Sequence, residues 1–86
     1  MSQLQLLDTV TNLQPIPSER LTLIEDVYTP IDYLPQGQVG TIVEVYDHNQ
    51  EVHYLVEFAD TQGCEYAMAT LKTQELLVLH YELSLV

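Results

Sequence analysis

Cysteine and histidine, the side chains that form structural zinc sites and that often act in nucleophilic catalysis, are few in this 86-residue sequence. The single cysteine, Cys64, precedes Glu65, and a neighbouring carboxylate disfavours the thiolate that a nucleophilic cysteine requires. A structural zinc site needs about four cysteine or histidine ligands at close spacing. Cys64 forms no C-x-x-C or H-x-x-x-H pattern with the three histidines, which are His48, His53 and His80. We therefore expect no metal site and no cofactor.

Two groups of carboxylates are close enough along the chain to be considered as a general acid and base. They are the neighbours Glu25 and Asp26, and Glu57 with Asp60 near the end of a predicted strand. Acid–base catalysis also requires a shielded pocket and a positioned partner. With thirteen acidic residues in the chain, such pairs arise by chance, and the sequence contains no G-x-S-x-G, phosphate-binding glycine loop or H-E-x-x-H. These patterns predict a protein that is not an enzyme.

Charge is the most informative feature of the composition. Thirteen acidic residues against Arg20 and Lys72 give a formal net charge of −11 at pH 7. Nucleic acids and acidic membrane surfaces are bound mainly through lysine and arginine, so neither is an expected partner. A basic protein partner fits the sign of the charge. An excess of acid also keeps a small apolar domain soluble, and both interpretations fit the composition.

The middle of the chain has the alternating pattern of an antiparallel meander. Polar turns at 47–50 and 60–63 separate three predicted strands, at 39–46, 51–59 and 64–71. In the second of these strands, strict alternation directs four apolar side chains toward the core: Val52, Tyr54, Val56 and Phe58.

The strand predicted at 39–46 also alternates. Its two faces are expected to carry Val39, Thr41, Val43 and Val45 on one side, and Ile42, Glu44 and Tyr46 on the other. Gly40 within this strand indicates a bulge or the close approach of another backbone. The acids expected to point toward solvent from the meander are Glu44, Glu51, Glu57 and Glu65.

The two ends of the chain have weaker patterns. Residues 1–19 are predicted as an N-terminal extension, a short strand or helical turn followed by a proline-containing loop, and 20–86 as the domain itself. Residues 20–28 fit a strand better than a helix, and a loop at 29–38 contains a Pro35-Gln36-Gly37 turn. One 3-10 turn at 72–75 and a strand at 76–83 complete the prediction. Closure of these short strands into a small barrel would leave no exposed edges.

The sequence offers no signal for export or membrane insertion. No apolar run approaches the roughly 18 residues of a membrane span, and no basic-then-apolar leader opens the chain. A lone cysteine forms no intramolecular disulfide, which suits a reducing compartment. We therefore expect a cytoplasmic protein.

Several motifs resemble those of a known family. They are G-Q-V-G-T-I-V-E at 37–44, Y-L-V-E-F at 54–58, D-T-Q-G at 60–63, Tyr66-Ala67 and T-L-K at 70–72. Over about residues 20–80, the chain is similar to the bacterial domain-of-unknown-function-4926 family. The resemblance implies an all-β fold, a small SH3-like β-barrel of about five antiparallel strands, with no defined activity. Both 6–10 and 21–27 look like the opening strand of that family.

Six tyrosines stand against one phenylalanine and no tryptophan. Tyrosine combines an apolar ring with a polar tip and suits both half-buried strand positions and interfaces. Tyr28 and Tyr33 fall in the long loop that would lie beside the peptide groove of an SH3-like barrel, and such aromatic-lined grooves bind extended proline-rich segments. The alternative is that both rings pack back on the barrel.

Two hypotheses for function follow. The first is a non-catalytic, acidic interaction module that docks a basic protein partner through Glu44, Glu57, Glu65, Tyr28 and Tyr33. Members of the family that this chain resembles are sometimes encoded near toxin genes. The resemblance thus implies an antitoxin or immunity-type neutraliser. The second is an accessory structural subunit or homo-oligomer in which exposed apolar residues, Leu55, Ile42 and the C-terminal tail, are covered.

The charge balance predicts that the protein does not bind double-stranded DNA or RNA at physiological salt. Duplex binding gains most of its affinity from cations that neutralise phosphates, and the chain has only Arg20 and Lys72. A gel-shift assay at micromolar protein should show unbound duplex alone. A shifted band that disappears on addition of salt would contradict this prediction.

Overall fold

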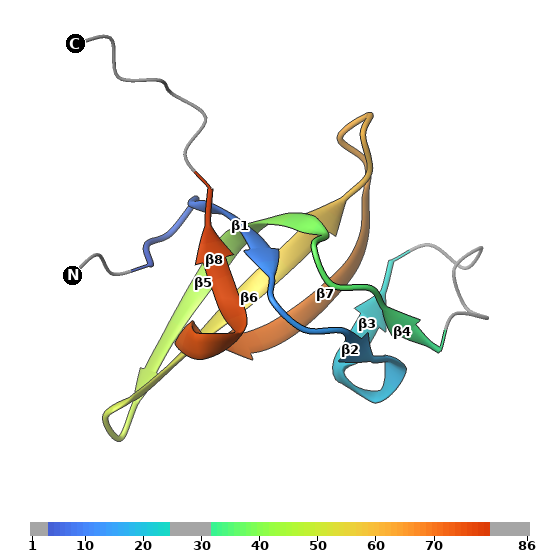
Figure 1. Ribbon diagram of the computed structural model, residues 1–86. Helices are drawn as coiled ribbons and strands as arrows, with labels where there is room; N and C mark the ends of the chain where they lie inside the picture. The colour runs from blue at the N-terminus through green and yellow to red at the C-terminus, as the bar shows by residue number, and fades with distance from the viewer. Residues whose placement is uncertain (1–3, 25–31, 80–86) are drawn as a thin grey trace, which may run out of the picture.

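The computed structural model describes residues 4–24 and 32–79 (Figure 1). Sequence predictions that concern Glu25, Asp26, Tyr28, His80 or the C-terminal tail lie outside the described residues. Among the residues that are described, no helix has the length and apolar character needed to cross a membrane.

The described part of the chain is all-β and antiparallel, which confirms the predicted class. A six-stranded sheet has the order β3-β7-β6-β5-β1-β8, and β2 pairs with β4 in a small second sheet (Figure 1). The strands are β1 (Thr9–Asn12), β2 (Ile16–Pro17), β3 (Leu21–Leu23), β4 (Tyr33–Leu34), β5 (Val39–His48), β6 (Glu51–Ala59), β7 (Glu65–Lys72) and β8 (Leu76–Val78). Two 3-10 helices, η1 (Ser18–Arg20) and η3 (Thr73–Glu75), precede β3 and β8.

The main sheet is open within the described residues, whereas the sequence predicted a closed barrel. Its outer strands, β3 and β8, each pair with a single neighbour, so no hydrogen-bonded ladder joins them. In the part of the chain that the structure describes, the sheet has six strands, where about five were predicted, and there are two 3-10 helices, where one was predicted. The additional strand comes from the N-terminal residues.

Residues 9–12 form an inner strand of the main sheet and are not an extension that precedes it. Strand β1 is hydrogen-bonded to β5 on one side and to β8 on the other. The predicted boundary between 19 and 20 therefore does not separate an extension from the sheet. Of the two candidate opening strands, the first contributes β1 and the second contributes β3, so both belong to the same sheet.

The three-stranded meander forms as predicted, and its middle strand holds the core. Strand β6 covers the predicted 51–59, with Val56 and Phe58 fully buried and Tyr54 5% exposed. These side chains pack with others contributed by β1, β5, β7 and β8, among them Val10, Ile42, Leu71 and Leu76. Ile42, which the second hypothesis treated as exposed, is fully buried.

A β-bulge in β5 changes which residues share a face. The register shifts between Ile42, which is opposite Val56, and Glu44, which is opposite Leu55. Two residues of β5 thus stand against one of β6, and the strict alternation predicted for 39–46 ends there. Glu44 consequently does not share the core-facing side of the sheet with Ile42. It lies on the opposite side, with Leu55 and Glu57. We call this side of β5–β6–β7 the outer face.

Gly40 has the close approach that its position in a strand indicated. A methyl group at this residue would lie 2.6 Å from Val56 Cγ1, 2.8 Å from the main-chain oxygen of Glu57 and 3.0 Å from Phe58 Cδ1. Real Cβ atoms do not approach backbone oxygens so closely, so only glycine lets β5 pack against β6 at this point.

Replacement of Gly40 by alanine is expected to destabilise the protein by about 1–3 kcal/mol, because the added methyl overlaps ladder backbone that has no room to move. Urea unfolding followed by circular dichroism measures this change. Val39→Ala, at the exposed neighbouring residue, is the control and should shift stability by less than about 0.5 kcal/mol. A Gly40→Ala protein as stable as the parent would contradict the close approach.

Candidate functional site

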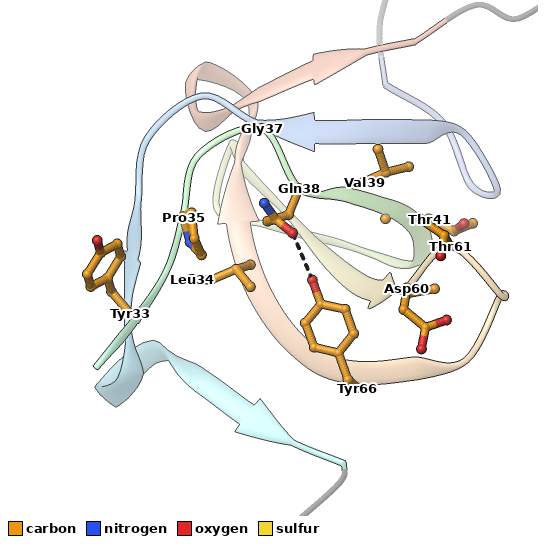
Figure 2. Close-up of a pocket in the computed structure, with 12 residues that line it drawn as sticks. Tyr33, Leu34, Pro35, Gly37, Gln38, Val39, Thr41, Asp60, Thr61 and Tyr66 are labelled. Atoms are coloured by element: carbon orange, nitrogen blue, oxygen red, sulfur yellow. Dashed lines mark hydrogen bonds between the residues drawn. The ribbon is translucent and has the colours of Figure 1, made fainter. Parts of the chain in front are cut away.

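A groove of about 900 Å³ lies between the β4–β5 connection, the end of β6 and the start of β7 (Figure 2). Its volume falls in the range of sites that bind small molecules or short peptide segments. The described residues that line it are Tyr33, Leu34, Pro35, Gly37, Gln38, Val39, Gly40, Thr41, Ala59, Asp60, Thr61 and Tyr66. No histidine, cysteine, lysine or arginine occurs among these lining residues.

One wall of the groove is held in place by the buried side chain of Asn12, which is 1% exposed. Its Nδ2 donates to the main-chain oxygens of Gln14 at 2.7 Å and Pro35 at 2.9 Å, and its Oδ1 accepts from the Gln38 N–H at 2.8 Å. The main-chain oxygen of Asn12 accepts from the Gly37 N–H, also at 2.8 Å. Strand β1 thereby fixes the residues that lead into β5.

The turn between β4 and β5 forms where the sequence predicted it. Gly37 has a φ of +84°, a conformation that favours glycine, and it allows the chain to reverse after Pro35. The next residue, Gln38, accepts a hydrogen bond at Oε1 from the Tyr66 hydroxyl at 3.3 Å (Figure 2). Tyr66 is 8% exposed, so its ring forms the floor of the groove and connects the turn to β7.

The opposite end of the groove is formed by the tight turn after β6. Asp60 Oδ1 accepts hydrogen bonds from the N–H groups of Gln62 at 2.9 Å and Cys64 at 3.0 Å. The Gly63 N–H donates to the main-chain oxygen of Asp60, and Gly63 has a φ of +82°. The predicted 60–63 turn is thus confirmed, and its first residue presents a carboxylate to the groove (Figure 2).

Three glutamates predicted to bind a partner lie on the outer face and form a diagonal series, which we call the acidic stripe. Glu44 is opposite Leu55, and Glu57 is two residues further along β6. Glu65 is opposite Ala59, two residues beyond Glu57 in the same direction. Each end of the stripe is therefore a diagonal neighbour of Glu57, a separation of about 7–8 Å that avoids direct opposition of like charges.

The acidic stripe borders the groove. Thr41, which lines the groove, is directly opposite Glu57 in the β5–β6 ladder. Ala59, which also lines the groove, is opposite Glu65 in the β6–β7 ladder. Carboxylates of the acidic stripe therefore lie beside the end of the groove that the 60–63 turn forms, and the Asp60 carboxylate lies within that end.

The two basic residues of the chain lie outside the groove. Arg20 forms a bidentate ion pair with Glu75, through Nη1 to Oε2 at 2.8 Å and Nη2 to Oε1 at 3.0 Å, and also donates to the Thr70 oxygen at 3.1 Å. The side-chain hydrogen bonding between Arg20 and Glu75 raises the pKa of Arg20 and lowers the pKa of Glu75, although partial burial of each group acts in the opposite direction. Arg20 is thus engaged in joining η1 to η3.

Of the two tyrosines predicted to bind a partner, Tyr33 lies at the rim of the groove with 53% of its surface exposed. Tyr28 lies outside the described residues. The structure adds Tyr66, Asp60, Gln38 and Asn12, which the sequence analysis did not assign to a site. Asn12 is two residues after Val10 and shares its buried face of β1. That spacing could have indicated a buried Asn12, but residues 1–19 lack the clear alternation needed to predict a strand there.

The described residues include no group of three or more histidine, cysteine, aspartate or glutamate side chains that could hold a metal ion. His53 Nε2 lies 3.8 Å from Glu51 Oε1 near the β5–β6 turn, away from the groove. The chemistry that the groove offers is binding, through aromatic and aliphatic surface, hydroxyl and amide groups, and a carboxylate.

The chain was compared with models of protein families, with curated proteins and with solved structures. A family model described as a domain of unknown function (DUF4926) matches residues 6–78, a segment that includes every strand of the main sheet. No curated protein and no solved structure matches the chain.

Replacement of Asn12 by alanine should lower the free energy of unfolding by about 2–4 kcal/mol, because three part-buried hydrogen bonds to the main chain are lost. Urea unfolding measures this loss, and the NMR amide signals of Gly37 and Gln38 should shift at the same time. Gln14→Ala removes only an exposed side chain and is the control. An Asn12→Ala protein with the parent's midpoint and unshifted turn signals would disprove the role given to Asn12.

Proposed function

The chain belongs to the DUF4926 family, described as a domain of unknown function, and we propose that it is a non-catalytic module that docks a basic protein partner. The observation that carries this proposal is the continuity of a tyrosine-lined groove with the acidic stripe. Grooves of this kind supply apolar contact area, and the neighbouring charges select the sign of the partner.

The electrostatics of the chain support a basic partner. With a net charge of −11, the protein as a whole attracts cations, and Arg20 is already paired with Glu75. The glutamates of the acidic stripe have no basic residue opposite them on the neighbouring strands, since their cross-strand partners are Leu55, Thr41, Met68 and Ala59. Such a field steers association and mainly raises the association rate.

We propose further that docking neutralises the partner, as an antitoxin or immunity protein does, and that this takes place in the bacterial cytoplasm. A basic effector that acts on a polyanion such as nucleic acid needs its cationic surface free, so an acidic protein that covers this surface would inhibit it. The single cysteine suits a reducing compartment. Catalysis is not part of the proposal, because Asp60 is the only carboxylate among the described lining residues.

A second candidate function, as a structural subunit or homo-oligomer, is favoured by a different observation. The sequence-based argument for this candidate assumed that Ile42 and Leu55 are exposed. Ile42 is buried, so it does not support the candidate, and Leu55 is only partly exposed, so it supports the candidate less. However, Leu6 and Leu7 are 55% and 71% exposed, and Leu7 has a φ of +71°, unusual for a non-glycine residue. Light scattering distinguishes this candidate, because it requires a mass that increases with protein concentration.

Removal of the three charges of the acidic stripe should slow association with a basic partner. The tagged protein is used to capture proteins from a lysate of its own cells at low and at high salt, and one basic protein should be recovered at low salt. A triple variant, E44Q, E57Q and E65Q, should associate with that protein about tenfold more slowly and with a weaker dependence on salt. Its stability should be unchanged or slightly raised, because no favourable charge pair is removed.

The matched control is E19Q, D47N and E51Q, which removes three exposed charges elsewhere and gives the same net charge. This control should keep nearly the parent's association rate. Equal slowing by the two triple variants would show that only total charge matters, and the proposed role of the stripe would then be wrong.

A further inference from the structure

The two edge strands of the main sheet, β3 and β8, expose different side chains. Each pairs with one neighbour within the described residues, so one side of its backbone has no ladder partner there. Strand β3 exposes the polar Thr22 and follows the charged Arg20. Strand β8 (Figure 1) exposes Leu77, at 50%. A charge, a proline or a bulge normally protects the edge strand of a monomer, and β8 has none of these.

The alternation of hydrogen bonds identifies which main-chain groups of β8 point toward β1. The Leu79 N–H donates to the Thr9 oxygen at 2.8 Å, and the Leu13 N–H donates to the Glu75 oxygen at 2.9 Å. In an antiparallel ladder such bonds recur at every second residue. Leu77, midway between Glu75 and Leu79, therefore also directs its main-chain groups toward β1.

Leu76 and Val78, on either side of Leu77, consequently direct their main-chain groups toward the free edge. The Leu76 N–H donates to the Thr73 oxygen in η3. The Val78 N–H and the main-chain oxygens of Leu76 and Val78 have no hydrogen-bond partner in the part of the chain that the structure describes. The edge of β8 thus offers one donor and two acceptors in a row.

The strands at this edge are uncharged, although the chain has a net charge of −11. Neither β1 nor β8 contains an ionisable residue, and Glu75, which precedes β8, is paired with Arg20. Two copies of an acidic chain repel each other least where they approach through uncharged surface. A basic partner, in contrast, finds no charge on this edge that would select it. The edge therefore suits a second copy of this chain.

An apolar row leads across the sheet to this edge. Val39 is opposite Thr11 in the β1–β5 ladder, and Thr11 is opposite Leu77 in the β1–β8 ladder. Val39 is 41% exposed, and the Thr11 hydroxyl between the two apolar side chains is buried, with no hydrogen-bond partner among the described residues. The row ends at Leu77, so a second copy that pairs with β8 would continue it with apolar surface.

We infer that β8 pairs in the antiparallel direction with β8 of a second copy, about a two-fold axis between the two Leu77 residues. The Val78 N–H of each copy donates to the Leu76 oxygen of the other. The two Leu77 residues form a pair without hydrogen bonds, in which Cα atoms are about 4.5 Å apart and side chains are in contact. A two-fold axis is the commonest symmetry of homodimers.

This dimer goes beyond the proposed function and leaves the acidic stripe free, because the stripe lies on β5, β6 and β7. The two-fold axis is perpendicular to the paired strands, so the outer faces of both copies lie on the same side of the continued sheet. The dimer therefore presents two acidic stripes together, which favours a partner with two basic segments. Its contact surface differs from Leu6 and Leu7, on which the second candidate function depends.

Light scattering of the full chain at a series of protein and salt concentrations tests the dimer. The mass should rise from that of one chain toward that of two as the protein concentration increases. Because salt screens the repulsion between two acidic copies, the dissociation constant of the dimer should fall about three- to tenfold between low and high salt. Docking of a basic protein weakens with salt, so the two associations respond in opposite directions.

Variants locate the contact. Leu77→Glu places two like charges directly opposite each other at the paired edges, so it should weaken the dimer about tenfold. The matched control is Thr22→Glu, which makes the same charge change at an exposed residue of the other edge strand and should leave the dissociation constant within about twofold. Leu7→Glu, at an exposed leucine outside β8, should also have little effect.

A disulfide tests the register. In a Cys64→Ser protein, which has no other thiol, Leu77→Cys should give a disulfide-linked dimer under mild oxidation. The expected Cα separation of about 4.5 Å lies within the range that a disulfide bridges. Thr22→Cys in the same Cys64→Ser protein is the control and should form the linked dimer at least about tenfold more slowly.

Several results would overturn the inference: the mass of one chain under every condition, equal effects of Leu77→Glu and Thr22→Glu, or equal rates of disulfide formation at the two cysteine positions. Loss of the dimer in Leu7→Glu alone would also overturn it and would place the contact at the N-terminal leucines. None of these results bears on the acidic stripe, whose triple variant is tested with a basic protein. A stripe variant that keeps that protein would, in turn, leave the dimer unaffected.

Discussion

The buried amide of Asn12 is the interaction on which the rest of the site depends. A polar group that is 1% exposed is tolerated only when its hydrogen bonds are made, and here both Nδ2 donors and Oδ1 have main-chain partners. These bonds join strand β1 to the turn that enters β5. Gln38 then carries the constraint to Tyr66 on β7. Residues far apart in the sequence are thereby brought together to form one groove.

The outer face depends on two local features of β5. Gly40 lets the strand approach β6 closely, and the bulge after Ile42 places Glu44 on the same side as Glu57. Three carboxylates on one face, without basic neighbours across the ladders, do not favour folding. Such an arrangement is stable because solvent screens the charges, and it leaves the face suited to a cationic partner. Stability and binding thus make separate demands on these residues.

The sequence predicted the local structure better than the long-range pairing. The alternation in 51–59 identified β6 and its buried side chains, because one face of that strand is core and the other is not. In β5, alternation failed after Ile42, since a bulge changes faces without a sequence signal of its own. Strand β1 was predicted only as a short strand or helical turn within 1–19, and its place inside the sheet was not predicted, because its partners, β5 and β8, are distant in the sequence. Tyr33 was predicted at a groove, whereas Asn12 and Tyr66 became recognisable only once these strands were paired.

The most direct test of this account is amide hydrogen exchange in the unmodified protein, measured by NMR. The Gly37 and Gln38 N–H groups are bonded to the main-chain oxygen and to Oδ1 of Asn12, both at 2.8 Å, although Gly37 lies in an exposed turn. If Asn12 holds the groove wall, both amides should exchange at least about 100-fold more slowly than in an unstructured peptide. Exchange of both at the unstructured rate would contradict a preformed groove.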